Sequence, residues 1–369
     1  MFRQILKKTI TDRRMRSAGK MTAEEEKMFP PLTEQEWNAV KNVWNIKMDG
    51  KRLKLYQKGF RIFKKLCGEE NFSPLYCPNN LFEPYILRSL NLPVHVLGLE
   101  RKDMYDMLFP NLPKPKIIFK RVGGQLFNSQ MNIIQIEDAC GLLREYDSVC
   151  VKPTFFSACG NGVKRLDCKN LSQKQFLDFF SAYDNDYIVQ EVLKQSPKTA
   201  MLSKKSLNTF RVSSLFINGK CTICSIINRI GRADSFVDNG FAGNYCVGVN
   251  EDGTYYTPAF DVKRRTYEST DTGIKFQGFH LSEIKELVEI VKDAHKTCLP
   301  HCGFCGWDFA LDADNKWNLI EINLYAPGIE IEQIGPKKPL FGDRTEEVVE
   351  YVNKHQPSLL AIMTSLGYM

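Results

Sequence analysis

Three side chains near the C-terminal end carry oxygen atoms at a spacing that suits a metal ion. Asp308 lies in the apolar run 306–311, and Glu321 and Asn323 lie in a second run, 318–323, after a polar turn. Turn-forming residues between two such runs predict a β-hairpin. Alternation along a strand puts Glu321 and Asn323 on one face, with Asp308 near Glu321 across the ladder. These hard oxygen donors favour Mg²⁺, which binds through one or two carboxylates and the phosphates of a substrate.

A lysine at the end of a predicted strand supplies the other half of a nucleotide site. Lys152 ends the apolar segment 148–152 and precedes a loop of small residues, 157–163. A fixed charge followed by several backbone N–H donors can hold phosphate oxygens. Alone, the pattern fits a surface lysine before an ordinary turn equally well, but a magnesium hairpin further along the chain favours the phosphate interpretation. The loop residues expected to contact phosphate are Ser157, Gly160, Gly162 and Val163.

Polar and basic residues lie on predicted strands between these two halves. The segment 187–193 ends in polar residues whose backbone groups can face an adenine ring. Asn208 and Arg211 introduce a long predicted hairpin, and Arg229 lies on its return strand. Arginines beside a phosphate site neutralise the charge that develops on a transferred phosphoryl group. Pairing of each arginine with an acidic residue on an exposed sheet is an equally good interpretation.

The helices and strands that must position these residues are predicted from the spacing of apolar residues and from the turn- and cap-forming residues between them. Residues 1–70 are predicted to be helical, with a capping box at Thr33 and Glu36. Residues 71–150 alternate short apolar segments, such as 93–98 and 116–120, with helical patterns. Residues 151–369 are predicted to form the nucleotide- and metal-binding part. Its hairpin after Asn208 comprises 209–217 and 222–230, and the predicted helices of the chain include 136–143, 172–182 and 281–297.

The composition is that of a soluble globular protein. Of 369 residues, 43% are hydrophobic and 25% are charged, which is enough apolar surface for two or three subdomains. We find no apolar run long enough to span a bilayer and no signal-peptide pattern, so we expect the protein in the cytoplasm. The 12 cysteines are scattered through apolar segments, as expected for reduced core residues.

The net charge of +7 is concentrated at the N-terminus. A solvated helix face is the simplest interpretation of this segment, and peripheral contact with an anionic membrane is the alternative. Nucleic-acid binding is not expected, because no recognition motif accompanies the charge. The basic residues within positions 1–20 are Arg3, Lys7, Lys8, Arg13, Arg14, Arg16 and Lys20.

A second set of metal-ligand residue types occurs just before the predicted hairpin. Cys298, His301, Cys302 and Cys305 have a spacing that resembles a zinc site, and zinc needs all four donors to converge. Because the run leads into a strand, Cys302 and Cys305 are predicted to point to opposite faces. Packed thiols are therefore the favoured interpretation, although the role of this cluster stays open.

The ordered set of motifs resembles the ATP-grasp superfamily over about residues 115–350. The motifs are Val-Lys-Pro at 151–153, Val-Gln-Glu-Val-Leu at 189–193, Asn-Thr-Phe-Arg-Val at 208–212, Gly-Trp-Asp-Phe-Ala at 306–310 and Leu-Ile-Glu-Ile-Asn at 319–323. Within the superfamily, the chain is most similar to the sugar-transfer-associated branch of bacterial polysaccharide gene clusters. The resemblance implies an α+β ATP-grasp fold with a helical N-terminal region.

The same resemblance implies roles for individual residues. Lys152 would contact the phosphates of ATP, with Arg121 as a second basic contact, and Arg211 and Arg229 would face the γ-phosphate or the reacting carboxylate. Asp308, Glu321 and Asn323 would bind one or two Mg²⁺ ions, and residues 238–240 would form an active-site loop. The adenine and ribose pocket would be lined by Gln190, Glu191, Val192, Leu193 and Asn208.

This resemblance implies an ATP- and Mg-dependent carboxylate–amine ligase that forms an acyl phosphate and releases ADP and phosphate. Its substrates would be small molecules or a sugar-linked acceptor in cell-surface polysaccharide synthesis. The chain departs from the branch at 195–197, where it has Gln-Ser-Pro instead of Gln-His-Pro, and at 268–273, where the usual His-Pro-x-Thr-Gly stretch is absent, so a histidine acid–base role is not expected at either place. Phosphate transfer to a hydroxyl, or a non-catalytic binding module for polyanions or membranes, are the alternative functions.

Overall fold

The structure is a computed structural model, and it describes residues 27–46, 53, 56–155, 162–183, 186–232, 244–261 and 263–356. Helices and two antiparallel sheets make up this part of the chain, which confirms the predicted α+β class. Each helix in these ranges is too short or too polar to cross a lipid bilayer.

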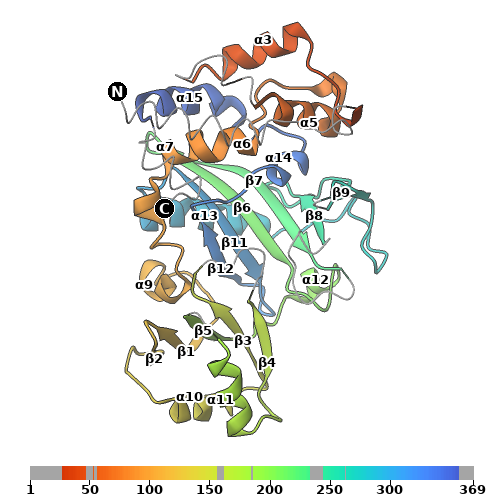
Figure 1. The fold of residues 1–369 in the computed structure, drawn as a ribbon. Helices are drawn as coiled ribbons and strands as arrows, with labels where there is room; N and C mark the ends of the chain where they lie inside the picture. The colour runs from red at the N-terminus through yellow and green to blue at the C-terminus, as the bar shows by residue number, and fades with distance from the viewer. Residues whose placement is uncertain are drawn as a thin grey trace.

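Helices form the first part of the described chain, and α3, α5 and α6 lie at the top of Figure 1, whereas α9 lies lower, near the smaller sheet. The predicted capping box is confirmed, because Glu36 N donates to Thr33 Oγ1 at 3.2 Å and Thr33 N donates to Glu36 Oε2 at 2.6 Å. The apolar segment after Leu92 begins as a helix, since Pro93 occupies the first helical position, where its missing N–H costs nothing. The elements are α3 (Glu34–Val43), α5 (Gln57–Cys67), η2 (Glu69–Asn71), α6 (Asn79–Leu81), η3 (Phe82–Leu87), α7 (Arg88–Leu90), α8 (Pro93–Val96), η4 (Lys102–Met104) and α9 (Tyr105–Leu108).

A five-stranded sheet with the order β2-β1-β5-β3-β4 forms the lower part of the described molecule in Figure 1. Helices α10 (Ile136–Leu143) and α11 (Gln173–Ser181) cover one of its faces. Phe119, Val149 and Val189 point to this side and pack into one buried cluster with the helices. The strands are β1 (Ile117–Val122), β2 (Gln125–Asn128), β3 (Ser148–Pro153), β4 (Lys164–Asp167) and β5 (Tyr187–Glu191).

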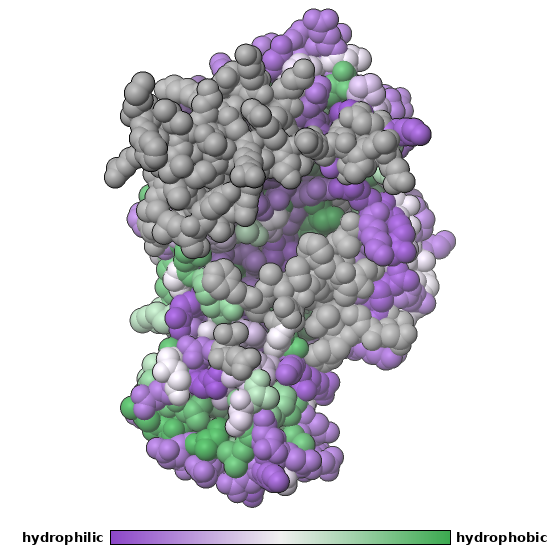
Figure 2. Space-filling model, viewed as in Figure 1, coloured by the Kyte–Doolittle hydropathy of each residue, from purple (hydrophilic) through white to green (hydrophobic). Residues whose placement is uncertain are grey.

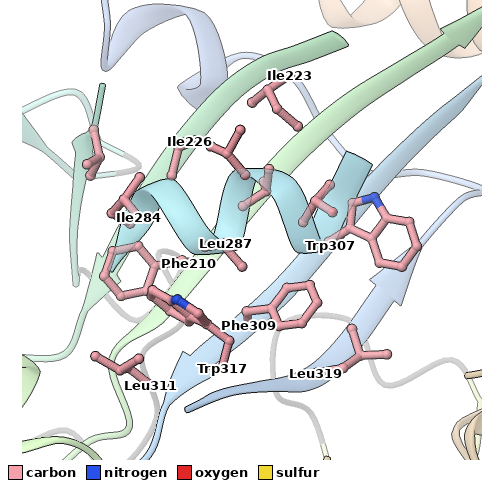
Figure 3. Close-up of a cluster of buried hydrophobic side chains, with 14 of the residues drawn as sticks. Phe210, Ile223, Ile226, Ile284, Leu287, Trp307, Phe309, Leu311, Trp317 and Leu319 are labelled. Atoms are coloured by element: carbon pink, nitrogen blue, oxygen red, sulfur yellow. The ribbon is translucent and has the colours of Figure 1, made fainter. Parts of the chain in front are cut away.

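A seven-stranded sheet with the order β10-β9-β8-β7-β6-β11-β12 forms the middle of the described molecule. One face packs against the long helix α13 (Ile284–Cys298), where Leu287 meets Phe210, Ile226 and Trp307 in the core shown in Figure 3. Burying one large aliphatic side chain in such a core stabilises the fold by about 1.5–3 kcal/mol. The strands are β6 (Thr209–Ile217), β7 (Lys220–Ile230), β8 (Tyr245–Gly248), β9 (Ala259–Phe260), β10 (Thr266–Tyr267), β11 (Phe304–Leu311) and β12 (Trp317–Asn323).

The side chains on the opposite face of the seven-stranded sheet are apolar at one end of the strands and polar further along. At one end, Leu215, Ile217 and Phe304 pack against the N-terminal helices and the C-terminal helix α15 (Thr345–Lys354). Further along the same face the inward residues become polar, and the short helix α14 (Ile331–Ile334) packs on β7. The remaining elements are α12 (Pro197–Ala200) and η7 (Gly342–Arg344).

Two neighbouring chain segments join the two sheets. Residues 113–116 lead into β1, and residues 191–195 lead out of β5. They lie side by side, because Glu191 N donates to Lys116 O at 3.1 Å. Each segment also contacts the hairpin of β11 and β12. Leu319 N donates to Pro113 O at 2.8 Å, and Ala313 N donates to Lys194 O at 2.8 Å. The hairpin of β11 and β12 thereby lies next to both segments that lead into and out of the smaller sheet.

Candidate nucleotide and metal site

The predicted metal hairpin is present as strands β11 and β12. Asp308 pairs with Glu321 across the ladder, and Gly306 pairs with Asn323. The two pairs are two positions apart along each strand, and side chains at such spacing point to the same side. Asp308, Glu321 and Asn323 therefore lie on the same face of the sheet, away from α13. Trp307 and Ile322 point to the other side and are buried in the core. The three oxygen-bearing side chains therefore come together as their spacing predicted.

Asp308 forms a bidentate ion pair with Arg211 on the neighbouring strand β6, directly opposite it in the register. Arg211 Nε donates to Asp308 Oδ1 at 2.6 Å, and Arg211 Nη2 donates to Oδ2 at 2.8 Å. The remaining nitrogen, Nη1, donates to Pro327 O at 2.7 Å. Both side chains are about 95% buried, at 5% and 6% exposure. A planar guanidinium with all three nitrogens engaged has a single well-defined orientation.

The charges of this pair support each other. Burial disfavours the charged form of Asp308, but Arg211 and Arg229 outweigh that cost, so the pKa of Asp308 lies below its ordinary value. Burial likewise disfavours the charge of Arg211, and Asp308 outweighs it, so the pKa of Arg211 is raised. Both groups are therefore ionised at neutral pH.

Arg229 and Asn323 complete the surroundings of Asp308. Arg229 Nη1 lies 3.5 Å from Asp308 Oδ2, with its side chain one quarter exposed. Asn323 Nδ2 donates to the same oxygen at 3.2 Å. Since the amide nitrogen of Asn323 faces Asp308, its carbonyl oxygen faces the other way and is left as a donor for a cation.

The donor set fits Mg²⁺. Asp308, Glu321 and Asn323 offer two carboxylates and one amide oxygen, which are hard ligands, and Mg²⁺ completes its octahedron with water and phosphate oxygens. In the described ranges, no three His, Cys, Asp or Glu side chains converge as a metal cluster, so an all-protein cage is not present there. The site is of the kind that needs the phosphates of a nucleotide to hold the ion.

Lys102 belongs to the site and was missed by the sequence reasoning. Its Nζ lies 2.8 Å from Glu321 Oε1, and the lysine side chain is 6% exposed, whereas Glu321 is 32% exposed. Its backbone N donates to Thr154 O at 3.0 Å, just after β3. Lys102 thus connects the end of the smaller sheet to the metal hairpin. In the sequence, Lys102 is visible only as a lysine in the helical region that precedes β1. A search for basic residues at the ends of predicted strands does not find it.

Lys152 lies on the free face of the smaller sheet, opposite α10 and α11. It pairs with Ile188 of β5, and Ile188 pairs on its other side with Lys120 of β1. Lys120 is buried and donates to Asp103 O at 2.7 Å, whereas Lys152 is half-buried. Among the described residues, no ion pair or hydrogen bond engages the Lys152 ammonium. A basic face with one such cation therefore opposes the metal hairpin.

The described part of the predicted phosphate loop, Gly162 and Val163, lies close to Pro153 at the end of β3, the strand that contains Lys152. Gly162 has φ +76, and a Cβ there would lie 2.7 Å from Pro153 Cγ, so only glycine fits without a shift. Val163 follows it, half-exposed, before β4. Ser157 and Gly160 lie outside the described residues, and so do residues 238–240 and the basic stretch 1–20.

Arg121 lies on the other face of the smaller sheet from Lys152. Its guanidinium stacks 4.8 Å from the centre of the Tyr187 ring and donates through Nη2 to Tyr183 O. Tyr187 belongs to the cluster that packs against α10 and α11. Strand alternation therefore separates Arg121 from Lys152 and places Lys120 beside it instead. The prediction for Arg121 depended on which face of the strand this residue occupies, and the sequence did not determine that face.

The predicted adenine-side residues lie where the two sheets are joined. Gln190 is buried and donates through Nε2 to Pro115 O at 3.2 Å, and Glu191 Oε1 accepts from Lys116 N at 3.0 Å. Val192 and Leu193 follow β5 and are half-exposed. Asn208 is fully buried, and its amide donates into the turn 195–206, for example to Thr199 O at 2.8 Å. Its side chain thus shapes the start of β6 rather than the connecting segment.

The cysteine cluster does not form four converging donors. Cys302 and Cys305 are fully buried in one core, so they do not point to opposite faces as predicted, because β11 begins only at Phe304. Cys305 Sγ lies 3.3 Å from His295 Nε2 on α13. Burial lowers the pKa of His295 to about 4, so this histidine is neutral. His301 is exposed, unlike Cys302 and Cys305.

Comparison with known proteins identifies the family of the larger part of the site. Residues 175–349 match the family model described as sugar-transfer associated ATP-grasp. This region, slightly under half of the chain, contains Arg211, Arg229 and the hairpin of β11 and β12, and it is similar to that family. The predicted resemblance is thereby confirmed. ATP and Mg²⁺ are the cofactors of ATP-grasp enzymes, and they are the cofactors that the sequence predicted. A search of curated proteins gives no match.

Solved structures that are similar to this chain include several named as ligases or synthetases. The ligase PsnB in complex with a minimal precursor is 13% identical, with a TM-score of 0.41, over 72% of this chain and 63% of that one. D-alanyl-alanine synthetase A from Vibrio cholerae is 15% identical, with a TM-score of 0.40, over 74% and 65%. The L-amino acid ligase from Bacillus licheniformis is 14% identical, with a TM-score of 0.37, over 69% and 48%. The chain thus covers less than two thirds of the length of each.

Proposed function

We propose that the protein is an ATP- and Mg-dependent carboxylate–amine ligase that works through an acyl phosphate. One observation carries the proposal: the oxygen donors of β11 and β12 lie on the polar face of one sheet, and Lys152, whose ammonium has no partner among the described residues, lies on the other sheet. A nucleotide triphosphate between them would meet positive charge and metal ligands together. The visible surface of the hollow below the upper helices is mainly hydrophilic (Figure 2), as such a ligand requires.

The residues would divide the work as follows. Lys152 and Lys102 would bind phosphate oxygens from the smaller sheet's side, and Asp308, Glu321 and Asn323 would hold one or two Mg²⁺ ions. The ion supplies charge stabilisation for the transferred phosphoryl group when it is bound. Arg211 keeps Asp308 in place, and the partly exposed Arg229 is the arginine free to turn toward the reacting groups.

The chemistry consists of two transfers without a protein nucleophile. A substrate carboxylate oxygen attacks the γ-phosphorus, the bond to the β-phosphate oxygen breaks, and ADP leaves. An amine nitrogen then attacks the acyl carbon, phosphate leaves, and the nitrogen loses a proton as the amide forms. Positioning and charge neutralisation are sufficient for the first transfer, in agreement with a site rich in cations and metal ligands.

The substrates are proposed by class only. We expect a carboxylate and an amine that are small molecules or a sugar-linked acceptor, in line with the description of the matched family. The PsnB structures contain a peptide precursor, Mg and ADP, and the D-alanyl-alanine and L-amino acid enzymes are named for amino-acid ligation. A role in cell-surface polysaccharide synthesis in the cytoplasm is part of the same proposal.

The test is a product assay. The protein is incubated with Mg-ATP and a matrix of amino acids, uronic acids and nucleotide sugars, with ADP release and product mass measured together. Hydroxylamine is added in parallel, because it captures an acyl phosphate as a hydroxamate. ADP, phosphate and a hydroxamate are the expected products. Release of AMP, or a phosphorylated alcohol as the only stable product, would instead show a different transfer and reject the ligase.

The basic stretch 1–20 is proposed to contact an anionic membrane surface rather than the reaction site. Its deletion should leave kinetics with soluble substrates unchanged and should weaken binding to vesicles that contain anionic lipid at low salt. A folded truncation without activity would place this segment in the site instead.

A further inference from the structure

Glu332 is a buried carboxylate that the sequence analysis did not select. It lies on α14, in the segment that follows the metal strand β12, and it is 5% exposed. Its Oε1 lies 3.8 Å from Arg211 Nη1, on the side of Arg211 that does not face Asp308. Helix α14 packs on β7, so Glu332 is held over the polar face of the larger sheet.

The carboxylate of Glu332 has little compensation for its burial. Apart from its own backbone N–H, no described residue donates a hydrogen bond to it, and Arg211 at 3.8 Å is beyond hydrogen-bond distance. The three nitrogens of Arg211 are already engaged by Asp308 and Pro327. A buried carboxylate in this situation retains the capacity to accept a hydrogen bond or a proton from a ligand.

The charged groups around Glu332 come from three strands. Arg211 on β6 and Arg229 on β7 favour its ionised form, and Asp308 on β11 disfavours it. Helix α5 also packs against α14, but its Arg61 and Lys64 bind Phe29 O and Glu36. The desolvation of Glu332 dominates these contributions, so its pKa is raised above the ordinary carboxyl value. A raised pKa brings a carboxylate closer to neutral pH, which suits a proton acceptor.

We propose that Glu332 is the catalytic base that binds the protonated amine substrate and removes its proton before the amine attacks the acyl phosphate. The inference rests on the proposed ligase function and extends it to the acceptor half of the reaction. It requires an acceptor that enters as an ammonium ion, such as the amino group of an amino acid or amino sugar. One proton moves from the ammonium nitrogen to Glu332 Oε, the carbon–nitrogen bond forms, the bond to phosphate breaks, and the second nitrogen proton leaves with the departing phosphate.

The competing role for Glu332 is that of a counter-charge for Arg211. A counter-charge would act on both halves of the reaction, because Arg211 holds Asp308 and Asp308 would hold the ion. A base would act on amine capture only. Hydroxylamine distinguishes the two roles, since it is largely unprotonated at neutral pH and attacks an acyl phosphate without needing a base.

The experiment compares Glu332→Gln with the wild type in two assays under the same conditions. The first measures hydroxamate from Mg-ATP, hydroxylamine and the carboxylate panel, and the second measures amide from the same panel with L-amino acids and amino sugars. We expect hydroxamate formation within about threefold of wild type and amide formation reduced by about 100-fold, within the 10²–10⁴-fold range that general bases contribute. In the wild type, the rate of amide formation should depend on pH through a group whose pKa lies above the ordinary carboxyl value, and in Glu332→Gln this pH dependence should be absent.

The matched control is Glu330→Gln, two positions earlier. Glu330 directly precedes the same helix, makes no side-chain capping hydrogen bond, and forms a half-exposed ion pair with Arg264 at 2.7 Å, so its loss should change neither assay. Equal loss of hydroxamate and amide in Glu332→Gln would show the counter-charge role, and unchanged amide formation would show no role; either result overturns the inference. Failure of the wild type to form any hydroxamate would reject the ligase function itself, which keeps the two conclusions separate.

Discussion

At the scale of single residues, the site contains three carboxylates with three different environments. Asp308 is buried and has a bidentate arginine, Glu321 is one third exposed and paired with Lys102, and Glu332 is buried and receives no hydrogen bond from another described residue. Because the cost of a buried charge depends on its partner, the three should respond differently to the same substitution.

Glu321→Gln should remove activity without unfolding the protein. The substitution keeps the volume and takes one charge from the metal ligands, at a position where solvent already reaches the side chain. We expect turnover to fall by more than about 100-fold, since even loss of a partner behind a metal ligand costs about 10–100-fold. ADP release at several Mg²⁺ concentrations and a circular dichroism melt provide the measurements. Turnover near wild type at ordinary Mg²⁺ would exclude the metal role.

Glu332→Gln should stabilise the protein at neutral pH. Burial raises the pKa of Glu332 in the folded state above the ordinary carboxyl value of 4.5, so ionisation at neutral pH is less favourable in the native than in the unfolded state. The gain in Tm over wild type should shrink as the pH falls through the raised pKa toward 4.5, and vanish below it. A destabilised variant at pH 7 would contradict this and indicate a structural ion pair with Arg211.

The sequence could identify Asp308, Glu321 and Asn323 because a two-stranded hairpin converts sequence spacing directly into contacts. It could not identify Lys102 or Glu332, since these reach the site from a helical segment and a short helix whose positions depend on long-range packing. For Arg121 the strand was predicted correctly, but the face depended on register with β5.

At the scale of elements, the position of α14 depends on close contact between two glycines. A Cβ at Gly248 of β8 would lie 2.8 Å from Gly335 C and Pro336 N, and one at Gly335 would lie 2.9 Å from Ile227 Cδ1. Because the nearest atoms at Gly248 are backbone, no side-chain rotation can relieve the contact. The glycine therefore allows the segment after α14 to approach the sheet and holds Glu332 near Arg211.

Gly248→Ala should move α14 away from the sheet. We expect a loss of about 1–3 kcal/mol of stability, as for other overpacked sites. Amide formation should fall more than hydroxamate formation, since Glu332 moves with the helix. Chemical denaturation and the two capture assays measure these effects. Gly141→Ala on α10 is the control, because nothing lies within 4 Å of a Cβ there and the change should be neutral or slightly stabilising. A Gly248→Ala protein as stable and as active as wild type would refute the packing argument.

Elements were predicted well wherever local sequence determines them. The two long hairpins and the helices at 136–143, 172–182 and 281–297 were found within a few residues, because their apolar periodicity is strong. The order of strands in the two sheets was not predicted, since pairs such as β1 with β5 join residues about 70 positions apart.

At the scale of the whole molecule, the two sheets are held together by few polar contacts near the site. Lys102 connects the end of β3 to Glu321, and the segments 113–116 and 191–195 run side by side. A ligand with phosphates between the sheets would add contacts to both. The arrangement thus predicts that nucleotide binding stabilises the whole described fold rather than one sheet alone.

Mg-ATP should therefore raise the stability of the protein as a single cooperative unit. A ligand that binds only the native state stabilises it by about 2.7 kcal/mol at a hundredfold excess over its Kd. Thermal melts with Mg-ATP, Mg²⁺ alone and ATP alone should show the largest shift for the combination, because the oxygen donors of Asp308, Glu321 and Asn323 need phosphate oxygens to complete the coordination of the ion. Lys152→Ala should reduce this shift, since it removes the free cation of the opposing sheet, and the fold should persist because that side chain forms no ion pair or hydrogen bond among the described residues. Absence of any shift at millimolar Mg-ATP, with calorimetry also silent, would exclude nucleotide binding between the sheets and with it the ligase mechanism.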